Sequence, residues 1–255
     1  MRQLPYHVLT RRMKVSATIF ERYEKKYLLT LQQQALLLEL LTTNLVPDEY
    51  GAYALSNIYY DTSSFELIRS SLEKPVYKEK LRLRSYGTPD KGDIVFIELK
   101  KKFDGIVYKR RLPLSYHEDA EVLRGDLLRS EEQVAREIGF FLSQYEVSAK
   151  AFICYDRIAF KEVNHPDVRI TFDSNIRFRQ TDLSLAAGAW GETLLSPDQV
   201  LMEIKIPGAF PLYLSRILSD MGIHSVSFSK YGNCFQQFVL PSYYHETRKI
   251  SCSIS

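Results

Sequence analysis

The sequence has few cysteines, no long apolar run and almost no net charge. Its cysteines, Cys154, Cys234 and Cys252, are scattered without C-x-x-C spacing, so neither a disulfide framework nor a zinc site is expected. The longest apolar run, at residues 35–41, is broken by Glu39 and is too short for a membrane span, which needs about 18 residues or more. The N-terminus also lacks an apolar signal core. A reducing, cytoplasmic compartment is therefore expected.

The charges nearly cancel, with 34 Lys and Arg against 31 Asp and Glu in 255 residues. This balance argues against a histone-like polycation, although a total does not show where the charges lie. The chain is 45% hydrophobic and 25% charged, which excludes collagen, coiled coil and wholesale disorder. Its length suits one large domain, and its 17 tyrosines favour a strand-rich protein with wet and dry faces.

Hairpin patterns dominate the middle of the chain. Residues 78–85, 94–101 and 107–114 alternate charged and apolar side chains between turn signals, which predicts a three-stranded meander. The pairs Thr30 with Gln33, Ser115 with Glu118 and Ser130 with Gln133 are spaced as capping boxes that open helices. Further strands are predicted over 20–29, 53–60, 149–161, 168–177 and 200–206. Helices are predicted over 31–45, within 116–142 and over 211–221, and residues 225–239 are ambiguous between strand and helix. The folded domain is expected to cover 20–240, with a leader or edge element at 1–19 and a disordered tail at 241–255.

The strand charges share one face. Because successive strand residues point to opposite sides, Lys80, Arg82 and Arg84 lie opposite Leu81 and Leu83. A sheet with one face in water is the simplest explanation. Repetition over six strands favours instead an α+β fold, a closed antiparallel β-barrel whose charges point into a lumen and whose outer face is covered by helices. The other residues that share a face in this way are Glu24 and Lys26; Glu98, Lys100 and Lys102; Lys109 and Arg111; Arg169, Thr171 and Asp173; and Glu203 and Lys205.

Such a lumen would bind a polyanion, because about ten basic groups meet only a few carboxylates. A chain of phosphates suits this excess better than a single carboxylate ligand does. Glu98 and Glu203 inside a basic site suggest Mg²⁺ or Mn²⁺, completed by phosphate oxygens. The alternative is that both glutamates form ion pairs, with Lys100 and Lys205 or with lysines across the sheet.

The chain resembles the VTC domain, the polyphosphate polymerase module of the vacuolar transporter chaperone complex, within the triphosphate tunnel metalloenzyme superfamily. The resemblance covers about residues 20–235 and implies a tunnel-like barrel that transfers the terminal phosphate of ATP to polyphosphate. The segments that carry it, in order, are RYEKKY at 22–27, YYDT at 59–62, KLRLRSYG at 80–87, IELKKK at 97–102, YKRR at 108–111, YDRIAF at 155–160, RITFD at 169–173, LMEIK at 201–205 and FSKYG at 228–232.

The resemblance also implies individual roles. Glu203 matches the metal-binding glutamate, and parity adds Glu98 as a second metal candidate and Arg111 and Lys205 as phosphate-binding candidates. Two departures are Ser227, where family polymerases carry a lysine, and Arg22, where the hydrolase and cyclase branch carries a glutamate. The residues that match the family's phosphate-binding positions are Lys26, Arg82, Arg84, Lys100, Lys109, Arg157, Arg169, Ser229 and Lys230, of which all but Ser229 are also expected to act in catalysis.

The expected activity is therefore a metal-dependent phosphotransferase with ATP and inorganic polyphosphate or pyrophosphate as ligands. The resemblance implies a stand-alone catalytic module with no membrane span of its own, and a membrane-protein partner could be encoded separately. A tri- or polyphosphate hydrolase on the same fold and a non-catalytic polyphosphate or nucleotide sensor are alternatives. Nucleic acid is not an expected partner, because binding of single strands usually needs aromatic residues among the basic ones.

Overall fold

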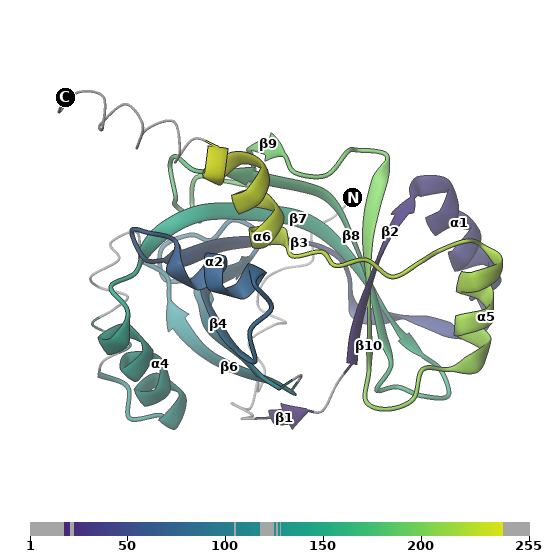
Figure 1. The fold of residues 1–255 in the computed structure, drawn as a ribbon, viewed down its shortest axis with the longest axis horizontal. Coiled ribbons are helices and arrows are strands. Elements are labelled where there is room, and N and C mark those ends of the chain that lie inside the picture. The colour runs from purple at the N-terminus through teal and green to yellow at the C-terminus, as the bar shows by residue number, and fades with distance from the viewer. Residues whose placement is uncertain are drawn as a thin grey trace.

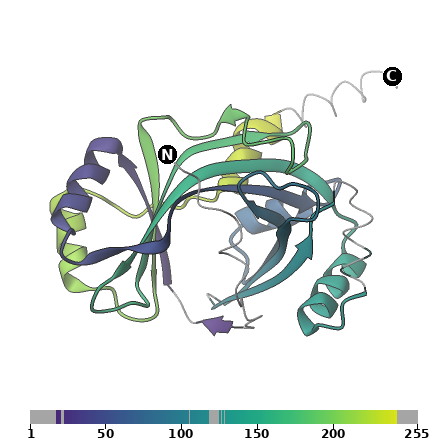
Figure 2. The same ribbon diagram turned by 180° about the vertical axis from the view of Figure 1, so that it is seen from behind.

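The computed structural model describes residues 18–20, 23–104, 106–117 and 129–241, together with Gly125 and Leu127. Its centre is one curved antiparallel sheet of ten strands, with helices packed against both of its sides (Figures 1 and 2). The strands are β1 (Thr18–Phe20), β2 (Tyr23–Thr30), β3 (Leu45–Asp61), β4 (Tyr77–Tyr86), β5 (Ile94–Phe103), β6 (Ile106–Ser115), β7 (Ser148–Glu162), β8 (Arg169–Arg179), β9 (Glu192–Thr193) and β10 (Gln199–Ile206); the helices are α1 (Leu31–Leu40), α2 (Glu66–Leu72), α4 (Gln133–Gln144), α5 (Leu212–Asp220), α6 (Lys230–Cys234) and the π-helical turn η2 (Phe235–Val239).

The two outermost strands of the sheet are consecutive in the chain. The strand order is β1-β6-β5-β4-β3-β7-β8-β10-β2, with β9 paired to β8. Strand β1 ends at Phe20 and β2 begins at Tyr23, and three Cα–Cα steps reach at most about 11 Å, so the sheet curls until its edges approach. Among the described residues these edges are not hydrogen-bonded to each other. The antiparallel sheet with flanking helices is thus confirmed, whereas the closure of the predicted barrel through hydrogen bonds is not observed.

Two apolar clusters join the helices to the outer side of the sheet. In one, Ile138 and Phe141 of α4 pack with Leu83 and Leu99 of β4 and β5. In the other, α1 and α5 pack on β2, β8 and β10, at the opposite end of the molecule from α4 (Figure 1). Leu alternates with Lys or Arg in the strands, so burial of the leucines under helices turns the charges to the inner side.

The third apolar cluster lies on the inner side and packs around α6. Ile153 of β7 and Leu201 of β10 lie there with Tyr231 and Cys234 of α6. The ring of Tyr59 stacks on that of Tyr231, with centroids 4.9 Å apart and an interplanar angle of 15°. This packing places the start of α6 beside the charged part of the inner side.

Some predicted helix ends and caps differ from those in the structure. Helix α1 ends at Leu40 rather than at residue 45, because β3 already begins at Leu45 and continues to Asp61. The capping box of Thr30 and Gln33 is confirmed. The one at Ser130 is wrong, because α4 starts at Gln133 and its N-cap, Glu132, makes no side-chain cap.

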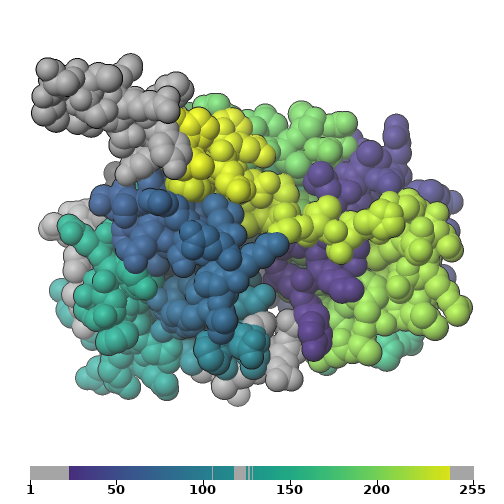
Figure 3. All heavy atoms as spheres, viewed as in Figure 1, coloured from purple at the N-terminus to yellow at the C-terminus, as the bar shows by residue number. Residues whose placement is uncertain are grey.

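The ambiguous residues 225–239 divide into an extended segment and a helix. Ser225 pairs with Tyr27, and the Val226 amide donates to the Lys26 carbonyl at 2.7 Å, so this segment covers the free edge of β2. In Figure 3 it runs across the front of the molecule beside the purple atoms of β2. The helix α6 follows at once, and the Ser229 side chain caps it by accepting from the Gly232 amide.

Most of the predicted leader and tail lie outside the described residues; within that leader Thr18–Phe20 forms the edge strand β1. In the described part of the chain, no helix combines the length and apolar character that a membrane crossing requires.

Candidate phosphate-binding site

Basic side chains from seven strands and from α6 converge on the inner side of the sheet. The strand register aligns them in rows, since Arg82 lies opposite Glu98 and Glu98 opposite Arg111. In the same way Glu203 lies opposite Lys26. We call the following residues the inner face: the cations Lys26, Lys80, Arg82, Arg84, Lys100, Lys109, Arg111, Arg157, Arg169, Lys205 and Lys230, and the carboxylates Glu24, Glu98, Asp173 and Glu203.

The strands β4, β5 and β6 form one wall of the inner face, where cations gather around a single buried carboxylate, Glu98, which is 2% exposed. Arg82 approaches its Oε2 to 2.6 Å and Lys109 its Oε1 to 2.8 Å, while Arg111 and Arg84 lie 3.3 and 3.8 Å from the carboxylate. Burial opposes ionisation of Glu98, but these cations outweigh it and hold its pKa well below the usual range. We call these five residues the Glu98 cluster.

Neutral partners orient the two arginines of β4. The Arg84 guanidinium donates to Asn57 Oδ1 at 2.8 Å and to the Tyr155 hydroxyl at 3.1 Å. The Arg82 guanidinium donates to the Tyr59 hydroxyl at 3.2 Å. Both guanidinium groups are therefore fixed in direction before any ligand binds, which is the arrangement that favours recognition of phosphate oxygens.

The strands β2, β7, β8 and β10, with the start of α6, form the other wall, where a second cluster surrounds Glu203 and the fully buried Asp173. Lys230 Nζ lies 2.5 Å from Asp173 Oδ2 and 3.3 Å from Glu203 Oε1. Arg157 holds Asp173 through two hydrogen bonds of 2.6 and 2.7 Å. Burial of Glu203 would raise its pKa, but Lys230, Lys26, Lys205 and Arg157 together hold it well below the usual value. The Glu203 cluster consists of Glu203, Asp173, Lys26, Arg157, Lys205 and Lys230.

Contacts across the curved sheet connect the two walls. Glu24 of β2 lies 3.3 Å from Lys26 on its own strand and 3.6 Å from Lys100 of β5, although β2 and β5 are far apart in the strand order. Lys80 Nζ donates to the Ser229 hydroxyl at the start of α6, at 2.9 Å. These contacts bring the two walls together into one basic region.

Crowding changes the protonation of several of these lysines. Burial, and then the neighbouring ammonium groups of Lys100 and Lys26, lower the pKa of Lys80 to about 7. Burial also lowers the pKa of Lys109 to about 7, although Glu98 partly offsets the effect, and that of Lys205 to about 8. Since an approaching anion favours the charged form, these lysines would take up protons when a polyanion binds.

Some polar atoms of the inner face have no hydrogen-bond partner among the described residues. They include Nε of Arg169 and, two residues along the same strand, Oγ1 of Thr171. Thr171 is 1% exposed and lies opposite Glu203 in the register. Leaving a buried polar group unpartnered costs about 1–3 kcal/mol, so these atoms favour a polar ligand that completes their hydrogen bonds.

The model of one protein family, the VTC domain, matches residues 21–239 of this chain. The chain belongs to the VTC domain family. Vacuolar transporter chaperone complex subunit 4 of Schizosaccharomyces pombe is 27% identical over an alignment covering 53% of this chain and 22% of that protein. This chain therefore spans about a fifth of that relative's length.

The fold of the VTC domain occurs in solved structures of low sequence identity. A candidate adenylate cyclase from Bacillus halodurans superposes with a TM-score of 0.50 at 16% identity, covering 86% of this chain and 97% of that one. A candidate adenylyl cyclase from Hippeastrum, described as having a dominant triphosphatase activity, has a TM-score of 0.48 at 17% identity and covers 84% of this chain and 94% of that one. The similarity to the Bacillus protein supports the shared fold.

The two predicted metal ligands of this VTC domain lie in different surroundings. Within the described part of the chain, the charged neighbours of Glu98 are all cations, whereas Glu203 has the second carboxylate Asp173 and the unpartnered Thr171 hydroxyl nearby. Among the described residues, no three or more His, Cys, Asp or Glu side chains form a cluster able to hold a metal ion. One carboxylate completed by substrate phosphates is nevertheless a common Mg²⁺ site, so the donor set fits at Glu203 better than at Glu98.

The sequence-predicted site residues lie together on the inner face, with two exceptions in position. Arg169 lies at its margin, 2.7 Å from Asp48, and Ser229 acts as the cap of α6 while it accepts from Lys80. The alternative ion pairs are also present: Glu98 pairs with Lys109 across the sheet, and Glu203 pairs with Lys205 on its own strand and with Lys26 across the sheet. Lys100 pairs with Glu24 instead. The phosphate-binding, catalytic and metal-binding roles stay predictions.

Sequence reasoning placed Lys80 and Asp173 on this face without assigning them a role. The signal for both was strand parity, which the structure supports at Lys80 through its bond to Ser229 and at Asp173 through Arg157 and Lys230. Asn57 and Tyr59 were missed, because β3 is apolar on both sides and its parity does not separate the faces.

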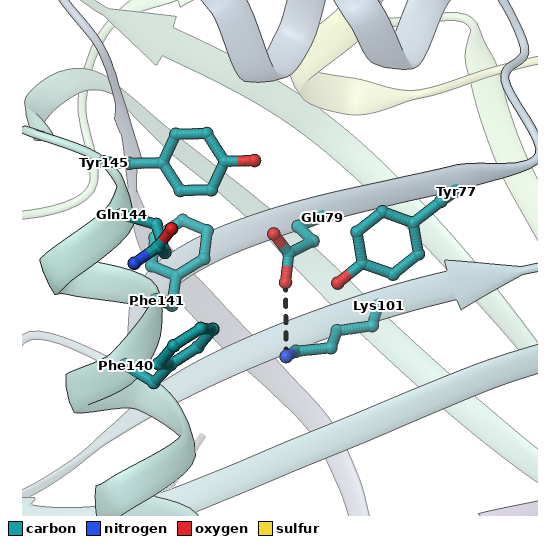
Figure 4. A pocket seen from close by; sticks show the side chains of 7 residues that line it. All are labelled: Tyr77, Glu79, Lys101, Phe140, Phe141, Gln144 and Tyr145. Atoms are coloured by element: carbon teal, nitrogen blue, oxygen red, sulfur yellow. Dashed lines mark ion pairs between the residues drawn. The ribbon is translucent and has the colours of Figure 1, made fainter.

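A pocket of about 310 Å³ lies outside this site, between α4 and the outer side of β4 and β5 (Figure 4). The dashed line in Figure 4 marks the ion pair between Lys101 and Glu79 in this pocket, 3.3 Å long. Lys101 and Glu79 have the opposite parity to Lys100 and Lys80, so this pocket and the inner face are separated by the sheet. The remaining residues of its lining are Tyr77, Phe140, Phe141, Gln144 and Tyr145.

Proposed function

We propose that this VTC domain is a polyphosphate polymerase-like phosphotransferase that uses ATP. The observation that carries the proposal is the inner face itself, where eleven cations outnumber four carboxylates. Such an excess of fixed positive charge suits several consecutive phosphates. Membership of the VTC domain family supports the same ligand class.

In the proposed reaction, a terminal oxygen of the acceptor phosphate attacks the γ-phosphorus of ATP in line. A new P–O bond forms to the acceptor, and the bond to the β-phosphate oxygen breaks, which leaves ADP and a chain longer by one phosphate. Arg82 and Arg84 would stabilise the charge on the transferred group, since their guanidinium groups are already oriented. No covalent nucleophile is needed.

A divalent ion, Mg²⁺ or Mn²⁺, would be held by Glu203. Such an ion would supply positive charge to the phosphates. Lys230, which bonds to both Glu203 and Asp173, would keep this carboxylate pair oriented and add its own charge to the site. Glu98 would act instead as the counter-ion that keeps its four cations together.

The test is incubation of the purified protein with ATP and Mg²⁺ or Mn²⁺, followed by gel analysis. A ladder of polyphosphate supports the polymerase; release of orthophosphate alone supports the hydrolase with water as acceptor. Binding of ATP or polyphosphate without metal-dependent turnover supports the sensor. The cytoplasmic location and a separately encoded membrane partner stay predictions.

A further inference from the structure

Aromatic side chains line the inner side of the sheet at one end of β3, β4 and β5. Tyr86 follows Arg84 by two residues on β4, and Phe96 lies opposite Arg84 on β5, so both rings share the side of the guanidinium groups. Ring centroids lie 5.8 Å apart for Tyr53 and Tyr86, and 5.9 Å for Tyr86 and Phe96. Tyr50 meets Tyr53 edge to face at 6.4 Å. We call these four residues the aromatic cluster.

The exposure of the aromatic cluster is unusual for rings packed in a core. Tyr50 is 46% exposed, Tyr53 and Tyr86 are half-buried, and only Phe96 is fully buried, at 8%. Rings that make edge contacts with each other and still show surface to solvent are available to another planar group. A fifth planar group already stacks on the cluster, because the Arg111 guanidinium lies 3.6 Å from the Phe96 ring centre.

The aromatic cluster is joined to the cations that would hold phosphate. Arg111 donates to the Tyr86 hydroxyl at 3.0 Å and also lies 3.3 Å from Glu98. Arg169 donates to the Tyr53 hydroxyl at 3.3 Å. A ligand that placed phosphate against the Glu98 cluster would therefore have the rings directly beside it.

We propose that the aromatic cluster is a stacking platform for the base of a nucleoside triphosphate, an inference that rests on the proposed function. Residues two apart on a strand are about 7 Å apart, so Tyr86 lies about one sugar's width beyond Arg84. The phosphates lie against the Glu98 cluster and the base lies on Tyr50, Tyr53 and Tyr86. Stacking on a ring tolerates any base, so the platform distinguishes nucleotides from inorganic phosphate chains rather than one base from another.

The test compares ATP with inorganic tripolyphosphate by calorimetric titration of each variant. Tyr50 contacts none of the inner-face cations in the described structure, so Tyr50→Leu removes a ring without disturbing them. We expect its affinity for ATP to fall about tenfold and its affinity for tripolyphosphate to change less than twofold. Tyr53→Leu and Tyr53→Phe form a matched pair, because only the first removes the ring. Tyr77→Leu is the control, an exposed ring on the outer pocket.

Each outcome decides one claim. Equal loss of both ligands in Tyr50→Leu, or no loss of ATP affinity in either Leu variant, overturns the platform. So does a wild-type protein that binds ATP no better than tripolyphosphate, although that result keeps the proposed function. A wild-type protein that binds neither ligand overturns the proposed function and the platform together. Loss of ATP affinity in Tyr53→Phe equal to that in Tyr53→Leu assigns the effect to the hydroxyl at Arg169 and also overturns the platform.

Discussion

The two charged clusters of the inner face differ in which cations they use. The Glu98 cluster sets three arginines and one lysine around a single carboxylate, and the Glu203 cluster sets three lysines and one arginine around two carboxylates. Guanidinium groups are planar and always charged, whereas ammonium groups are point charges that rotate and titrate. The Glu98 cluster therefore presents mainly planar groups of constant charge, and the Glu203 cluster mainly ammonium groups that titrate.

The difference shows in the surroundings as well. Arg82 and Arg84 are oriented by Tyr59, Asn57 and Tyr155, so their positions do not depend on a ligand. Lys230, on the other wall, comes from α6 and not from the sheet. Its position therefore depends on the packing of α6, whose residues Tyr231 and Cys234 are buried in the apolar cluster of the inner side.

The largest expected effect tests the arginines of the Glu98 cluster. Arg82→Ala should lower the rate of ATP-dependent polyphosphate synthesis by about 10²–10³-fold, because one preorganised donor to the transferred phosphate is removed. The fold should survive, since Glu98 keeps Lys109 and Arg111 as partners. Initial rates and thermal unfolding of Arg82→Ala are compared with those of Arg216→Ala, an exposed arginine on α5. Full activity in Arg82→Ala would remove Arg82 from the site.

A smaller effect distinguishes Glu203 from Glu98 as the metal ligand. Glu203→Gln should raise the Mn²⁺ or Mg²⁺ concentration needed for half-maximal activity by about tenfold or more, because it weakens a metal ligand. Glu98→Gln should leave that concentration unchanged, whatever it does to the maximal rate. The measurement is a metal titration of activity for the wild type and both variants. An equal shift in both would show that the two walls do not differ in metal binding.

The smallest effect is a pH dependence that arises from the lysines. Lys80 and Lys109 have pKa values lowered to about 7, so they lose their positive charge as the pH rises through neutrality. Affinity for tripolyphosphate should therefore fall a few-fold between about pH 6 and pH 9. Calorimetric titration across this range measures it, and Lys80→Arg should flatten the curve, since arginine stays charged. A curve equally steep in Lys80→Arg would exclude Lys80 as a source.

The strand alternation made much of this site predictable. Lys80, Arg82 and Arg84 are separated by leucines, and a half-buried strand with that pattern can place its charges on only one side. The same argument located Glu98, Glu203 and their neighbours. It could not reach Lys230, which lies on a helix, or Asn57 on β3, where both sides of the strand are buried and apolar residues do not mark the faces.

Local patterns also failed where a longer-range contact decided the boundary. The run of leucines after Thr30 suits a helix beyond Leu40, but β3 pairs from Leu45 with β7, and that pairing ends the helix early. Residues 225–229 are extended because they lie along β2, a partner almost two hundred residues away that no local propensity describes.

Because side chains alternate strictly along a strand, the order of residues is enough to predict that one side of the antiparallel sheet is basic. It does not specify which cations surround which carboxylate, since that depends on the folded arrangement of the strands and α6. The curvature of the sheet brings Lys100 of β5 to Glu24 of β2, and the packing of α6 brings Lys230 to Asp173 and Glu203. Such contacts join residues that are distant in the chain, so they require the complete sheet, whose apolar outer side packs under α1, α4 and α5.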